Sequence, residues 1–164
     1  IERIGEGPWY DANGRLVSND LAGLIGERPA GDPATVSDLP DECGRPISEL
    51  GDAHDVPTSS DSNGRLRSTN PESTCNDWTS SDPNVATNNG GGSGGGNRET
   101  QVYCGHTFPR QGRGAQDGRG QQWLSDHPLR GCGKGAMLIQ GRTDRNCIGC
   151  SGGYGGLYCF VEAE

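Results

Sequence analysis

The cysteine pair Cys147-Ile148-Gly149-Cys150 has a spacing that can do chemistry. C-x-x-C is the spacing of a zinc knuckle or of a redox-active dithiol. A second C-x-x-C, which would strengthen the zinc interpretation, is absent from the sequence. The cysteine content as a whole favours structural disulfides, so we expect these two sulfurs to belong to two different bridges.

A second group of residues offers oxygen ligands of the kind that calcium prefers. Asp82-Pro83-Asn84 follows Trp78 closely, and Asn76 and Asp77 lie beside it in the sequence. Loop carboxylates and amides in such a stretch suit calcium, while an ordinary polar turn is the competing interpretation.

Two further stretches, Asp11-x-Asn13-Gly14 and Asp61-x-Asn63-Gly64, resemble the beginning of a calcium loop. Neither is completed by the bidentate Glu that an EF-hand requires. Because Asn-Gly accepts the backbone angles of a tight hairpin, we predict plain hairpin turns at both places.

The histidines show no pattern that points to a site. His54, His106 and His127 share no ligand spacing, and we expect each to be a surface or packing residue. No G-x-S-x-G motif is present, and no nucleophile, base and stabilising group can be named together. The sequence therefore predicts that the protein is not an enzyme.

Composition indicates how such residues are held in place. Leu, Ile, Val and Phe together make up 24 of 164 residues, below the ~20% that usually separates folded from disordered chains. Seven cysteines compensate for the small core and indicate an oxidising, extracellular location, secreted or at the cell surface. The odd count leaves one sulfur for a partner elsewhere. A net charge of −8 argues against binding to nucleic acid or to anionic membranes. No apolar run approaches the ~20 residues of a membrane span.

Local patterns predict short elements joined by long loops. Trp9 to Val17 reads as a hairpin around Asn-Gly, followed by a helix over 21–25 that Ser18 or Asn19 caps and Gly26 ends. Strands are expected at 136–140 and 156–161, and most of 27–74 as surface loop. The Gly-rich stretches 88–97 and 110–120 are expected to be flexible loops within one domain.

Two elements are distinctive: Cys75-Asn76-Asp77-Trp78-Thr79-Ser80-Ser81, and the closing Leu157-Tyr158-Cys159-Phe160. With Gly7-Pro8-Trp9-Tyr10 and a lone Trp123 in the same order, they resemble a family of bacterial extracellular proteins with an endostatin-like, C-type-lectin-like fold. The resemblance covers most of the chain. It implies one α+β domain over 1–164, with short strands, long loops and one or two short helices. The stretches 88–97 and 110–120 and the extra cysteines depart from the family.

The resemblance also implies a disulfide pattern. In that family a preceding segment carries a helix and a cysteine, so Cys159 would pair outside this sequence, with a separate N-terminal fragment or another chain. The same pattern suggests Cys150 with Cys75. The remaining sulfurs are assigned as Cys104 with Cys132, preferred for their short separation, and Cys43 with Cys147.

The resemblance and the long loops together predict an extracellular binding or adhesion module that recognises a protein or glycan partner. One alternative is a calcium-dependent, carbohydrate-binding lectin with Asp77, Asp82, Asn84 and Asp126 as metal ligands. A second alternative is a structural subunit of a surface layer or fibre, linked through its leftover cysteine.

Overall fold

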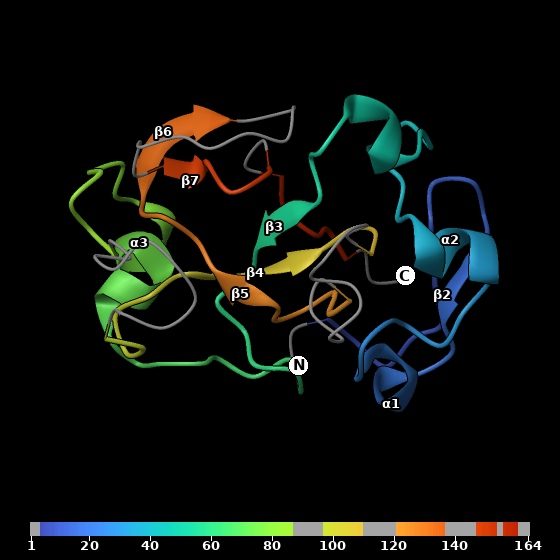
Figure 1. The fold of residues 1–164 in the computed structure, drawn as a ribbon. Helices are drawn as coiled ribbons and strands as arrows, with labels where there is room; N and C mark the ends of the chain where they lie inside the picture. Colours follow the sequence, from blue (N-terminus) through green and yellow to red (C-terminus); the bar gives the residue numbers. More distant parts are fainter. Residues whose placement is uncertain (1–3, 87–96, 110–120, 137–146, 154–155, 161–164) are drawn as a thin grey trace.

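The computed structural model describes residues 4–86, 97–109, 121–136, 147–153 and 156–160, and Figure 1 shows its short elements. In chain order these are β1 (Trp9–Tyr10), β2 (Leu16–Ser18), α1 (Leu21–Leu24), α2 (Pro33–Ser37), the 3-10 helix η1 (Ile47–Leu50), β3 (Asp55–Pro57), the 3-10 helix η2 (Pro71–Thr74), α3 (Cys75–Trp78), β4 (Tyr103–His106), β5 (His127–Pro128), β6 (Gly133–Ala136) and β7 (Cys147–Gly149). Few short helices combined with short strands confirm the α+β class.

The sheet β3-β4-β5 lies at the centre of the fold and is antiparallel throughout. Figure 1 shows it between the N-terminal elements β2, α1 and α2 and the group formed by α3, β6 and β7. The hairpin β1-β2 is antiparallel, and β6-β7 is parallel. Because each sheet is small, the sheets are held together largely by side chains, turns and disulfides.

Three turns of one kind, Asp11–Arg15, Asp41–Arg45 and Asp61–Arg65, connect extended segments. In each, the Asp carboxylate accepts the backbone N–H groups of the residues two and four positions later, at 2.9 or 3.0 Å. The Gly N–H donates to the Asp carbonyl at 2.9 or 3.0 Å. The plain-turn predictions at 11–14 and 61–64 are confirmed. The third turn was not predicted because Cys43 stands where the other two have Asn.

The first predicted elements need only small corrections. The hairpin around Asn-Gly is present as β1-β2, and α1 follows it. The helix is capped by Asp20, whose carboxylate accepts from the N–H of Gly23, instead of by Ser18 or Asn19. Its last residue is Leu24 and its C-cap is Ile25, one residue before the expected Gly26.

The strand predicted at 156–161 is wrong for the part of it that the structure describes, although its side chains alternate in burial. Residues 156–160 pair with no strand among the described residues. Tyr158 and Phe160 pack on Trp123, while Leu157 and Cys159 are exposed. The segment is therefore held by alternate side chains. Of the strand predicted at 136–140, Ala136 ends β6 and the rest lies outside the described residues, as do the predicted loops at 88–97, except Asn97, and 110–120.

Two apolar clusters form the core. One contains Trp9, Leu24, Leu39 and Trp123. The other contains Cys75, Ala86, Val102, Cys104, Leu129 and Cys132, and the Cys75–Cys132 disulfide lies within it. Closing that loop of 57 residues stabilises the fold by about 4 kcal/mol on the chain-entropy estimate. The stapling expected from the composition is thus present.

The disulfide pairing differs from the one that the resemblance implied. Cys75 pairs with Cys132 instead of Cys150, and Cys147 pairs with Cys150 within the C-x-x-C motif. The pairs Cys75–Cys150, Cys104–Cys132 and Cys43–Cys147 are therefore wrong. Separate bridges for the two C-x-x-C sulfurs are wrong as well, because the turn after β7 brings them together with a Cα–Cα distance of 5.1 Å.

Three cysteines lie outside these two disulfides: Cys43 and Cys159 are exposed, and Cys104 is buried. An exposed Cys159 suits the predicted link to another chain or fragment, which stays a prediction.

The segment labelled α3 is a left-handed turn. Its four residues, Cys75 to Trp78, have φ angles of 52°, 54°, 55° and 61°. Such a conformation costs roughly 1–2 kcal/mol per residue, so the surroundings must hold it. The Thr74 hydroxyl accepts from the Asp77 N–H, the Thr79 hydroxyl donates to the Asn76 carbonyl, and the disulfide anchors Cys75. The turn leaves Trp78 44% exposed.

Candidate metal centre

The register of the central sheet gathers polar side chains on one of its faces. Asp55 on β3 lies opposite His106 on β4, and Cys104 on β4 lies opposite His127 on β5. Because alternate residues of a strand share a face, Cys104 and His106 point the same way. Three strands thus deliver four functional side chains to one place, and His54 enters from the residue just before β3.

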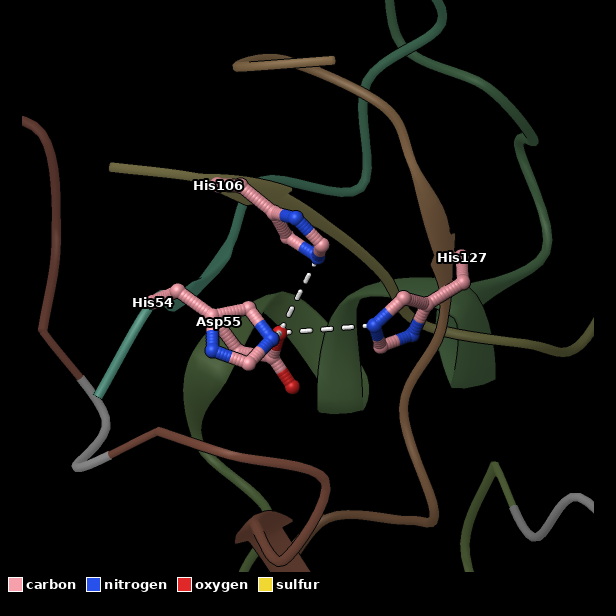
Figure 2. A group of neighbouring side chains, drawn as sticks. All are labelled: His54, Asp55, His106 and His127. Carbon is pink, nitrogen blue, oxygen red and sulfur yellow. Dashed lines mark ion pairs between the residues drawn. The ribbon is translucent and has the colours of Figure 1, made fainter. Parts of the chain in front are cut away.

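Figure 2 shows the three imidazole rings directed at the Asp55 carboxylate. The Oδ1 atom of Asp55 lies 3.1 Å from Nε2 of His54, 3.2 Å from Nε2 of His106 and 3.4 Å from Nε2 of His127. One ligand atom from each of the four residues lies within 4.8 Å of every other. The chain has three histidines, and all of them meet here. We call these four residues the His–Asp cluster.

Burial makes this convergence costly without a further partner. The side chains of His54, Asp55 and His106 are fully buried, and that of His127 is 29% exposed. Nε2 of His54 and both Asp55 carboxylate oxygens are buried without a hydrogen-bond partner. Buried polar groups are normally hydrogen-bonded, and an unsatisfied one costs about 1–3 kcal/mol. Several such atoms at one point indicate a place for a cation.

The three distances from the Asp55 oxygen fit a tetrahedral zinc ion. Two ligand atoms that are each ~2.0–2.1 Å from such an ion lie about 3.3–3.4 Å apart. The three nitrogen–oxygen distances, 3.1, 3.2 and 3.4 Å, are close to that edge length. The ligands of one ion direct their lone pairs at the ion and not at one another. Short contacts between ligand atoms without hydrogen-bond geometry are therefore expected at such a site.

Electrostatic coupling holds the cluster together. Burial alone would raise the pKa of Asp55, but His106, His127 and His54 outweigh it and lower that pKa well below its usual range. Burial likewise opposes charge on His106, yet Asp55 and Cys104 raise its pKa to about 9. They also raise the pKa of His127, where Cys104 contributes the largest favourable effect. Burial lowers the pKa of His54. The charged Asp55 carboxylate therefore stabilises positive charge at the centre of the cluster.

Groups behind the ligands orient two of the rings. Oδ1 of Asp52 lies 2.8 Å from Nδ1 of His54, and Nδ1 of His127 lies 3.2 Å from the Pro128 carbonyl. A carboxylate or carbonyl beside one ring nitrogen favours a proton there and leaves Nε2 free to bind metal.

Backbone around the cluster is fixed from two sides. The Arg28 guanidinium is largely buried and donates to the carbonyls of Val36, His106 and Thr107, which ties down the end of β4. On the other side Gly152, with a φ of +130°, packs on the His54 ring. A Cβ at Gly152 would lie 2.7 Å from Cε1 of His54, so only glycine fits there without moving the ligand.

The predicted calcium ligands are not gathered in this way. Asp77, Asp82 and Asn84 are exposed, and Oδ1 of Asp82 accepts from the backbone N–H and the amide of Asn84. Asp126 lies elsewhere, with Oδ1 3.9 Å from Nε2 of His106, beside the cluster. Within the described ranges, the His–Asp cluster is the group of His, Cys, Asp and Glu side chains that converges closely enough for a metal ion. Calcium at the predicted residues stays a prediction.

Each histidine was expected to be a surface or packing residue; His54 and His106 are buried, but all three histidines gather around Asp55, which the sequence did not predict. Their separations of 52 and 21 residues carry no ligand pattern, because the sheet brings them together. Two local signals were present in the sequence: His54 precedes Asp55 directly, and Cys104-Gly105-His106 has the alternate spacing that puts two ligands on one face of a strand.

Comparisons of the chain with protein-family models, with curated proteins and with solved structures give no match. Among the described residues no helix is both long enough and apolar enough to span a membrane. Fold and site together describe an α+β domain with two disulfides and a buried cluster of metal-ligand type.

Proposed function

We propose that this protein is a metal-binding domain in which His54, Asp55, His106 and His127 hold one divalent transition metal ion, with zinc the best fit. The observation that supports it is the convergence of three imidazole nitrogens on one buried carboxylate oxygen, with Nε2 of His54 and both Asp55 oxygens lacking a hydrogen-bond partner. Three imidazoles and one carboxylate suit zinc, whereas calcium and magnesium prefer a shell of oxygen atoms.

The ion would stabilise the fold. All four ligands come from the protein and three are fully buried, which is the arrangement of structural zinc sites. It would tie β3, β4 and β5 together at the centre of a chain that has few large apolar residues. Binding energy at such a site adds directly to folding energy. The metal would thus serve the same purpose as the disulfides.

Zinc titration of chelator-treated protein tests this function. We expect one zinc ion per chain by calorimetry and elemental analysis, a higher melting temperature with zinc, and no binding in Asp55→Asn. Asp126→Asn is the matched control, since Asp126 lies beside the cluster but outside it. Equal zinc binding by wild type and Asp55→Asn would rule the site out.

A second candidate function, recognition of a glycan by a C-type-lectin-like scaffold, is favoured by a separate surface feature. An apolar cleft of about 260 Å³ has Trp123 and Leu24 in its wall and the exposed side chains of Trp78, Ile25 and Leu157 at its rim. Ser60 and Asn63 also line it. An exposed indole beside hydroxyl and amide groups suits a sugar ring, which has an apolar face and a polar edge.

Glycan arrays with the wild type and two variants test this candidate. Trp78→Ala should lose glycan binding, while Tyr10→Ala should keep it, because Tyr10 is an equally accessible aromatic residue, 59% exposed, that does not line the cleft. A blank array for the wild type, with and without calcium, would remove this candidate and leave the metal site untouched.

A further inference from the structure

The free thiol of Cys104 lies directly against the His–Asp cluster. Cys104 is fully buried, outside both disulfides, and on the same face of β4 as His106. Its Sγ atom lies 3.5 Å from Nδ1 and 3.8 Å from Nε2 of His127. The other two cysteines without a bridge, Cys43 and Cys159, are exposed, so neither shares this environment.

The sulfur stands at the distance that a shared metal ion would give. With a zinc–sulfur bond of ~2.3 Å and a zinc–nitrogen bond of ~2.0–2.1 Å, the two ligand atoms of a tetrahedral site lie about 3.6 Å apart. The 3.8 Å between Sγ and Nε2 of His127 is close to this value. The same nitrogen is 3.4 Å from Oδ1 of Asp55, so Asp55 and Cys104 are both candidate ligands for an ion that His127 binds.

The unsatisfied carboxylate of Asp55 points to the same ion. Both of its oxygens are buried without a hydrogen-bond partner, one strand away from the sulfur. The Sγ atom also lies 3.3 Å from the His127 carbonyl oxygen, to which a thiol can donate. A nucleophilic role is disfavoured, because a fully buried sulfur cannot meet a substrate.

We propose that Cys104 is a further ligand of this metal centre, which makes it a site for thiophilic ions such as Zn²⁺, Co²⁺ and Cu⁺. This inference rests on the proposed function. When the sulfur–metal bond forms, the thiol S–H bond breaks and its proton leaves to solvent, with no change in oxidation state. Soft sulfur beside imidazole nitrogen selects these ions over calcium and magnesium.

Cobalt substitution tests the proposal, because Co²⁺ reports both its geometry and its ligands. Chelator-treated wild-type protein with Co²⁺ should show visible bands of a four- or five-coordinate ion and a near-ultraviolet sulfur-to-cobalt charge-transfer band. Cys104→Ser should keep the visible bands, lose the charge-transfer band and bind zinc at least tenfold more weakly. Cys43→Ser, which removes an exposed thiol, should match the wild type in every respect.

The outcomes separate the two proposals. Visible bands without a charge-transfer band in the wild type would overturn the role of Cys104 and leave the metal site standing. No cobalt bands at all would overturn both. The wild-type spectrum alone decides the sulfur ligand, so the test does not depend on how well Cys104→Ser folds, and Cys104→Ala provides a second variant.

Discussion

The carboxylate of aspartate has opposite surroundings in the His–Asp cluster and in the acidic turns of this protein. In the turns at Asp11, Asp41, Asp61 and Asp82, the carboxylate accepts N–H groups from its own following residues. In the cluster, Asp55 accepts no hydrogen bond and faces three imidazoles from distant positions. A carboxylate that is satisfied locally shapes the backbone, whereas a buried one left unsatisfied is available to a cation.

Removing one imidazole from the cluster should have the largest effect. His106→Ala leaves the Asp55 charge buried with fewer partners, which typically costs about 3–5 kcal/mol, or roughly 10 °C in melting temperature for a chain of this size. We also expect it to abolish zinc binding, measured by calorimetry. Asp82→Asn in the exposed turn is the control and should change neither quantity. Equal effects of the two substitutions would contradict the proposed difference between the buried cluster and the exposed turn.

Moving His54 without removing it should have the next largest effect. Gly152→Ala places a methyl group against the His54 ring, and loss of such support typically weakens metal binding 10- to 100-fold. Gly26→Ala is a close control, because Gly26 has a similar φ of +126° and its nearest neighbour to a new Cβ, the Arg28 carbonyl, is 3.9 Å away. Both variants bear the backbone strain, so a zinc affinity lowered equally in both would show that His54 is not involved.

Asp11 lies in one of the turns and its carboxylate is also buried. It therefore tests how much hydrogen bonds from nearby residues contribute to stability. Burial opposes its ionisation, but the Arg15 N–H, the Thr35 hydroxyl and the Arg15 and Asn13 groups together lower its pKa. A lowered pKa in the folded state means that stability is present above pH ~4, the pKa of an unfolded Asp, and is lost as the pH falls below it.

We expect Asp11→Asn to cost about 1–3 kcal/mol at pH 7 and to flatten the dependence of stability on pH below about 4. Asp61→Asn should cost less, because its turn has the same backbone bonds while the Thr35 hydroxyl donates to Asp11. Urea unfolding at pH 7 and pH 3 measures both variants. A larger loss in Asp61→Asn would contradict the role of Thr35.

Calcium should have the smallest effect. The exposed oxygen of Asp82 already accepts two bonds from Asn84, so calcium must compete with the turn and with water. For a dissociation constant no tighter than the calcium concentration used, the gain is at most about 0.4 kcal/mol. We expect a smaller rise in melting temperature with calcium than with zinc, and none in Asp82→Asn. A calcium shift as large as that of zinc would establish the acidic turn as the main metal site.

Features decided within a few residues were predictable. The Asn-Gly turns, the hairpin that includes Trp9 and the short helix after it depend on backbone angles and nearby hydrogen bonds, and all are present. The segment Leu157 to Phe160 was predicted to be a strand, which it is not. Its lack of strand pairing was not foreseen, because a neighbouring strand is not a property of the segment itself.

The sequence by itself determined the α+β fold class, the turns and the reliance on disulfides, since these follow from composition and from hydrogen bonds between nearby residues. Only the tertiary structure decided which sulfurs pair and which residues form the site. The antiparallel register of β3, β4 and β5 brings His106 and His127 to Asp55 across separations of 51 and 72 residues. Such contacts depend on how strands align in space, and no spacing along the chain encodes that alignment.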